Sequence, residues 1–104
     1  MMLWRDVPGF EGHYEISDTG LIRNWVTWRI LRPRITWEGS NIVNLSTGGV
    51  HKTRIVHRLV AQVFIPQPIG KNVVKHKDGN KNNNEADNLY WTHSKRPVKE
   101  RIPV

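Results

Sequence analysis

The sequence predicts a small α+β domain: an N-terminal antiparallel β-sheet, a single helix, and then two short strands with a shortened final helix. Three observations predict this order. Short alternating apolar and polar runs, separated by Gly-containing turns, fill the chain up to residue 55. A helical period begins at Val56, and a polar loop between two short apolar runs follows it. At 104 residues the chain can bury one modest core. We therefore expect one domain, 1–104, built from a module over 1–55 and a module over 56–104.

The first half reads as one twisted antiparallel meander of four or five short strands. The tripeptide 18–20 and the segment 47–49 are tight turns that reverse the chain. Pro33 restricts the third strand to an edge of the sheet, because proline has no N–H to donate. The expected strands are 14–17, 21–25, 28–36, 42–46 and 53–56.

The period changes to that of a helix at Val56. Five apolar residues fall on one helical face, and Pro66 with Pro68 stops the helix after Phe64. Those five residues are Val56, Leu59, Val60, Val63 and Phe64.

The last third contains two short strands around a polar loop. We expect strands over 73–76 and 89–92, joined by a loop over 77–87 that turns at Asp78-Gly79. A final helix can begin at His93, but Pro97 and Pro103 limit it to one or two turns.

The charge of the chain favours a polyanionic partner. Sixteen Lys and Arg against nine Asp and Glu give a net charge of +7. Four arginines and no acid lie between Thr19 and Trp37, namely Arg23, Arg29, Arg32 and Arg34. Such a surface suits DNA or RNA, because each neutralised phosphate releases counterions. The alternative is that the charge only keeps a small protein in solution.

Composition also excludes several classes. There are no cysteines, which excludes disulfide frameworks and cysteine-based zinc sites. No apolar run is long enough for a signal peptide or a membrane span. We expect a cytoplasmic protein, in the cytosol of the host cell if a phage encodes it.

One constellation carries chemistry. His76 ends a predicted strand, where a fixed imidazole is well placed to act as a general base toward water. Asn88, twelve residues later, can hold that imidazole in one tautomer through its amide oxygen. Neighbouring carboxylates or amides can bind a hard cation such as Mg²⁺. The alternative is a loop packed around a hydrogen-bonded histidine.

Three motifs, in order along the chain, resemble one family. The run VVKHKDGNKNNN over 73–84, followed by NLYWT over 88–92, resembles the core motif of phage-type HNH (ββα-metal) homing endonucleases. VHRLVA over 56–61 with FIP over 64–66 resembles the helix before that core. VPGFEG over 7–12 with YEIS over 14–17 resembles the nuclease-associated module fused to it.

The resemblance implies metal-dependent hydrolysis, or nicking, of double-stranded DNA with Mg²⁺ or Mn²⁺. In this family pattern His76 is the general base, and Asn88 orients it and braces the loop. The strands of the N-terminal module lie in a DNA groove, which implies six candidate phosphate or base contacts. These are Arg23, Arg29, Arg32, Arg34, Lys52 and Arg54.

Two positions depart from the family pattern. Lys75 precedes the general base, where the family has an acid or amide that ligates the metal. Arg96, or Lys95 if the register slips by one, matches the second ligand position. Lysine and arginine offer only donors and positive charge, so neither binds Mg²⁺, although both can contact a DNA phosphate. His93 or Asp78 would then have to supply the metal ligand in an active nuclease. Otherwise the chain is a catalytically silent relative that binds DNA or a host protein.

Overall fold

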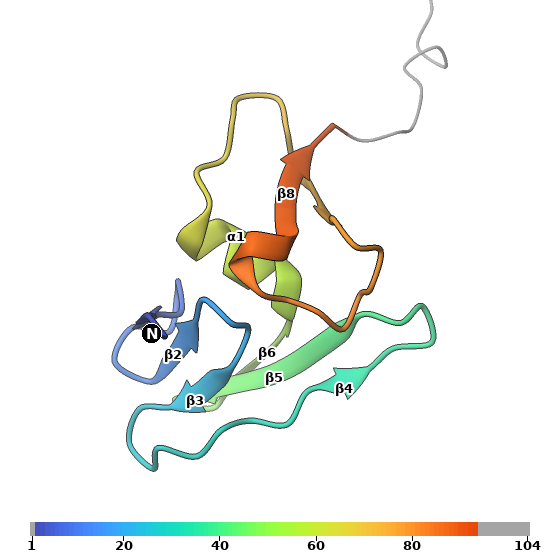
Figure 1. Ribbon diagram of the computed structural model, residues 1–104. Helices are drawn as coiled ribbons and strands as arrows, with labels where there is room; N and C mark the ends of the chain where they lie inside the picture. The colour runs from blue at the N-terminus through green and yellow to red at the C-terminus, as the bar shows by residue number, and fades with distance from the viewer. Residues whose placement is uncertain (1, 94–104) are drawn as a thin grey trace, which may run out of the picture.

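A computed structural model of the protein describes residues 2–93, and it has the predicted α+β architecture (Figure 1). Ten short elements follow one another within these residues. They are β1 (Trp4–Asp6), β2 (Tyr14–Ser17), β3 (Ile22–Asn24), β4 (Arg34–Ile35), β5 (Asn41–Thr47), β6 (Val50–Ile55), α1 (Val56–Phe64), β7 (Val73–His76), the 3-10 helix η1 (Ala86–Asn88) and β8 (Leu89–Thr92).

The N-terminal half forms two antiparallel sheets, so the prediction of a single meander was wrong. One sheet has the order β1-β2-β3 and the other β4-β5-β6. The expected strand over 28–36 shrinks to Arg34–Ile35, with one isolated bridge between Arg23 and Ile30. The chain leaves the first sheet because the Asn24 side-chain oxygen accepts the N–H groups of two following residues and closes a turn. Trp28 then adopts a positive φ of 63°, which takes the chain out of strand geometry.

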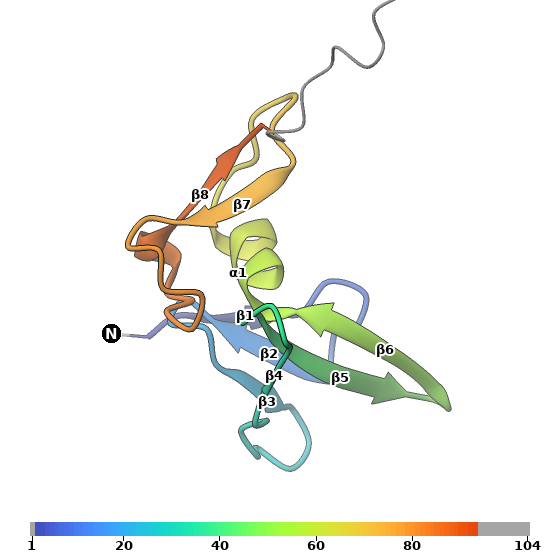
Figure 2. The ribbon, with the colours of Figure 1, turned by 90° about the vertical axis from the view of Figure 1, so that its right-hand side faces the viewer.

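The helix α1 begins directly after β6 and has the bounds that the sequence predicts. Val56, Leu59, Val60 and Ala61 are its buried residues. It ends at Phe64, one residue before Ile65-Pro66, as expected for a chain that proline prevents from continuing as a helix. Figure 2 shows α1 lying between the N-terminal sheets and the β7–β8 hairpin. The helix thus connects the two halves of the core.

The last described element is the predicted hairpin. In its antiparallel register Val73 lies opposite Thr92 and His76 opposite Leu89. Trp91 is buried, and its indole N–H donates to the carbonyl of Ile65 over 3.1 Å, which ties β8 to the end of α1. The expected final helix after His93 lies outside the described residues.

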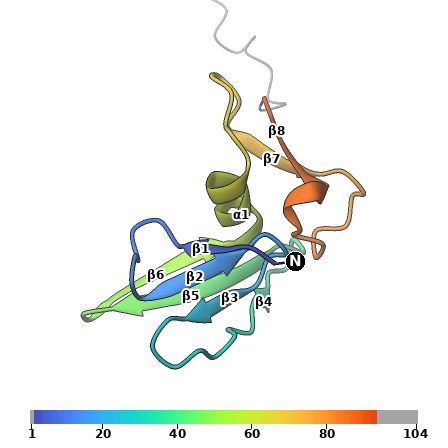
Figure 3. The same ribbon diagram turned by 60° about the vertical axis from the view of Figure 1, so that its left-hand side comes forward.

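One core runs through the whole described chain. Its buried side chains come from both N-terminal sheets, α1 and the hairpin, and Figure 3 shows the helix standing over the strands. Tyr14 joins the two sheets, because its hydroxyl donates to the carbonyl of Ser46 over 3.1 Å and accepts the N–H of Ser46 over 3.2 Å. Within residues 2–93, no helix is both long and apolar enough to cross a membrane.

Candidate phosphate-binding and catalytic site

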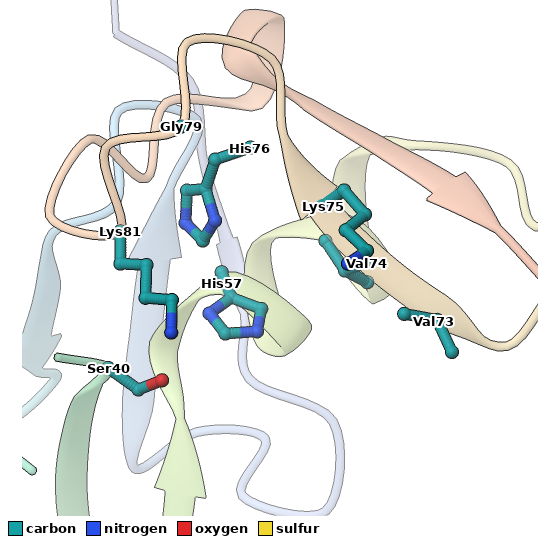
Figure 4. Close-up of a pocket in the computed structure, with 8 residues that line it drawn as sticks. All are labelled: Ser40, His57, Val73, Val74, Lys75, His76, Gly79 and Lys81. Atoms are coloured by element: carbon teal, nitrogen blue, oxygen red, sulfur yellow. The ribbon is translucent and has the colours of Figure 1, made fainter. Parts of the chain in front are cut away.

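An open cleft of about 390 Å³ lies where the end of β7 meets the start of α1 (Figure 4). Figure 4 shows His76 and Lys81 pointing from the hairpin side toward His57 on the helix, with Ser40 beside them. The lining residues are Ser40, His57, Val73, Val74, Lys75, His76, Gly79 and Lys81. Among residues 2–93, two lysines and two histidines line the cleft and no carboxylate does, so the electrostatic character of this lining favours an anion.

The imidazole of His76 is held by an amide. Its Nε2 lies 2.8 Å from Oδ1 of Asn84, and Asn84 is only 5% exposed. An amide oxygen is an acceptor, so this bond requires the proton on Nε2 and leaves the lone pair on Nδ1. A histidine in that tautomer can accept a proton from water or a hydrogen bond from another donor.

In the structure the side-chain amide that bonds His76 belongs to Asn84, whereas the sequence led us to expect Asn88 to orient this ring. The side-chain nitrogen of Asn88 donates to Asp78 Oδ1 over 2.9 Å and to the carbonyl of Asn83 over 2.8 Å. Its oxygen accepts the N–H of Asp78 over 3.2 Å. These bonds engage both polar atoms of the Asn88 amide and brace the loop, as the resemblance implies. The amide of Asn88 does not bond His76. Burial distinguishes Asn84 from the neighbouring asparagines, and a linear sequence does not reveal burial within a polar run.

His57 adjoins His76 as a neutral neighbour. The two rings meet edge to face with centroids 4.8 Å apart. Burial, followed by the charges of His76, Arg58 and Lys81, lowers the pKa of His57 to about 4. Its Nδ1 is buried and makes no hydrogen bond within the described part of the chain. His57 therefore stays uncharged at neutral pH and adds no repulsion toward His76.

Asp78 acts as a loop brace in this structure. Its carboxylate accepts hydrogen bonds from the Asn83 side chain, the Asn80 backbone and the Asn88 side chain, in that order of effect, and these lower its pKa to about 2. His93 lies beyond Thr92, at the opposite end of the hairpin from His76, and its Nδ1 faces the carbonyl of Gly70 at 3.2 Å. The structure therefore does not bring His93 and His76 together.

The described residues do not fit a divalent metal site. Over residues 2–93 no three His, Cys, Asp or Glu side chains are grouped closely enough to hold an ion. Lys75 and Lys81 line the cleft, and cations there repel a metal. Arg96, the second position that departs from the family pattern, lies outside the described residues. We therefore assign no chemical step to a metal.

The N-terminal cations divide into two groups. Arg23 makes its contacts within the fold. Its guanidinium forms an ion pair with Glu15 over 2.7 Å and lies 3.9 Å from the ring of Trp4 and 4.2 Å from the ring of Trp28. Arg54 is half-buried, with its guanidinium 5.9 Å from the ring of Phe10. The other four predicted contacts are exposed, namely Arg29, Arg32, Arg34 and Lys52.

Comparison with known families agrees with this architecture. The NUMOD4 motif matches residues 2–46, and the HNH endonuclease family matches residues 54–96. The two matches together span residues 2–96, so the chain combines a NUMOD4 motif with an HNH endonuclease region that follows it.

Individual relatives match almost the whole chain. It is 41% identical over 101 residues to the DNA endonuclease I-HmuI of Bacillus phage SP01, a match that covers 97% of this chain and 58% of that protein. A solved structure described as DNA binding and cleavage by the HNH homing endonuclease I-HmuI superposes with a TM-score of 0.83, over the same 97% and 58%. An uncharacterized HNH endonuclease of Acanthamoeba polyphaga mimivirus is 43% identical over 99 residues, which cover 95% of this chain and 29% of that protein. The chain thus spans less than two thirds of the length of these relatives.

Proposed function

We propose that the chain binds double-stranded DNA and holds one backbone phosphate in the cleft beside His76. The observation that carries this proposal is the composition of the cleft: Lys75, Lys81 and two histidines line it, and none of its lining residues in the described part of the chain is a carboxylate. A lysine ammonium is a strong donor to phosphate. The solved relative I-HmuI, whose structure is described as binding and cleaving DNA, supports the choice of DNA as the polyanion.

The two lysines have different roles in this proposal. Lys81 already donates to the carbonyl of Glu38 over 2.9 Å, which fixes the turn before β5 against the hairpin loop. An ammonium has three donors, so two remain for a phosphate. Lys75 makes no side-chain hydrogen bond to residues 2–93, so its ammonium is available to the ligand. Both cations therefore contribute to the affinity for DNA.

Salt dependence of DNA binding tests the proposal. Anisotropy of a labelled duplex should show log K falling with log salt, and Lys75→Ala or Lys81→Ala should each reduce the slope by about 0.9. Lys71→Ala is the matched control, because Lys71 lies in the loop before β7, at the end of the hairpin away from His76. Salt-independent binding, or slopes that all three variants leave unchanged, would refute a phosphate in the cleft.

A second candidate function is nicking of the bound strand with His76 as general base. The hydrogen bond that the Nε2–H of His76 donates to Asn84 Oδ1 favours it, because this bond leaves the lone pair of His76 on Nδ1. In that reaction Nδ1 takes a proton from water as the water oxygen attacks phosphorus, and the phosphorus–oxygen bond to the leaving strand breaks.

Conversion of supercoiled plasmid to the nicked form separates the two candidates. The assay includes Mg²⁺, Mn²⁺ and a chelator, with His76→Ala as the control variant. Nicking that disappears in His76→Ala would establish the nuclease. Protein that shifts DNA without nicking it under any of these conditions would be a DNA-binding member of the family.

A further inference from the structure

The N-terminal module touches the HNH region at the residue that holds His76. Gly20, in the turn between β2 and β3, has a φ of +94°, and a Cβ placed on it would lie 3.0 Å from the backbone oxygen of Asn84 and 3.1 Å from its Cβ. A hydrogen bond joins the same two segments close by. The N–H of Ala86, two residues after Asn84, donates to the carbonyl of Asp18, two residues before Gly20, over 2.7 Å. The turn and the loop are therefore in direct backbone contact.

Asn84 is buried in a loop of mostly exposed residues. Its exposed fraction is 5%, whereas Asn80, Lys81, Asn82 and Glu85 are all exposed. A buried amide is costly unless its polar atoms find partners. The oxygen of Asn84 finds that partner in Nε2 of His76. The position of the loop backbone thus determines where this acceptor lies.

We propose that Asn84 is the positioning residue of His76 and that the 18–20 turn of the N-terminal module sets it in place. The turn fixes the loop backbone through Gly20 and Asp18, and Asn84 then fixes the imidazole through Nε2–H. The state of the ring depends in this way on a contact from the other module. The value of a fixed ring for phosphate binding or proton transfer rests on the proposed function, but the positioning itself is measurable without DNA.

Long-range ¹H–¹⁵N NMR of the full chain, without DNA and at a pH where histidine is neutral, reads the ring directly. His76→Gln assigns the signals of His76 by their loss. In the wild type we expect a protected Nε2 proton on His76. Asn84→Leu keeps a similar volume without an acceptor and should speed exchange of that proton roughly tenfold, the factor that one such hydrogen bond represents.

Asn84→Asp supplies the conservative rescue. Its carboxylate accepts the same bond, so protection of the Nε2 proton should return. Fast exchange in both Asn84→Leu and Asn84→Asp would overturn the role of Asn84, as would full protection in Asn84→Leu.

Gly20→Ala tests the contribution of the other module, with Gly9→Ala as the matched control. Gly9 has a similar φ of +86° but nothing within 4 Å of its Cβ position, so both variants carry the same backbone penalty. Only Gly20→Ala should displace Asn84 and speed exchange at His76 toward the Asn84→Leu value. Identical His76 signals in two folded glycine variants would refute the coupling.

Two further results keep the test decisive. If Gly20→Ala does not fold while Gly9→Ala does, Ala86→Pro removes the N–H that donates to the Asp18 carbonyl and should speed exchange at His76; unchanged His76 signals in that folded variant would refute the coupling. Loss of DNA binding in the anisotropy assay would remove the proposed function and leave the NMR result unaffected. The two proposals therefore fail by different measurements.

Discussion

His57 gives the chain a pH-dependent stability that can be worked out from the structure. Burial lowers its pKa from 6.5 to about 4, so below pH 6.5 the unfolded chain takes up a proton that the folded chain refuses. Stability therefore falls as the pH drops from about 6.5 to about 4, and it is regained above that window. The full difference between these two pKa values sets an upper bound of about 3.4 kcal/mol on the loss in the free energy of unfolding. The ring is only partly enclosed, so solvent screening reduces the expected loss to about 1–2 kcal/mol.

Urea unfolding followed by tryptophan fluorescence measures this loss. The free energy of unfolding of wild type and of His57→Gln is measured at about pH 7 and at about pH 4.5. Most of the range in which the unfolded and folded pKa values of His57 differ lies between these two pH values. The carboxylates of the chain titrate in both proteins, so the difference between their pH dependences isolates His57. The wild type should lose about 1–2 kcal/mol more than the variant on acidification. Parallel losses in the two proteins would refute the argument that burial keeps His57 neutral.

Other substitutions test the packing. Tyr14→Phe should lower the free energy of unfolding by about 1–3 kcal/mol, because it leaves both backbone groups of Ser46 without their partner; an unchanged urea midpoint would contradict the link between the sheets. Leu45→Ala, at a fully buried position, should cost about 2–5 kcal/mol in the same titration. Arg23→Gln should reduce stability yet leave the salt slope of DNA binding unchanged, and a slope lowered by about one would restore Arg23 as a phosphate contact. Trp37→Ala, at a side chain that is 94% exposed, should change stability by less than about 0.5 kcal/mol by thermal unfolding.

The elements that follow from local patterns could be predicted from the sequence. The helix α1 has the predicted bounds, because an apolar face over Val56–Phe64 meets a proline two residues later. The hairpin strands β7 and β8 also match, since a polar loop separates two short apolar runs. The residues that carry these patterns lie within, or next to, the elements that they predict.

What depends on distant contacts could not be predicted. The division of the N-terminal strands into two sheets follows from the turn at Asn24 and the positive φ of Trp28, neither of which a strand pattern reveals. Arg23 was a candidate DNA contact because the family resemblance places the N-terminal strands in a DNA groove; in the structure its guanidinium lies against two tryptophan rings, a contact that the strand pattern does not reveal. The choice between Asn84 and Asn88 depends on how the loop closes, because the sequence offers several amides in the same run.

The contact between Gly20 and Asn84 also has a consequence for the order of folding, because more than half of the chain separates the two residues. The strands β1–β6 pair mostly with near neighbours, so they can form while the C-terminal part is still being synthesised. Closing the loop between Gly20 and Asn84 carries the entropic cost of a long-range contact. We therefore expect the imidazole of His76 to become ordered late in folding, after the strands that carry the basic N-terminal residues have paired.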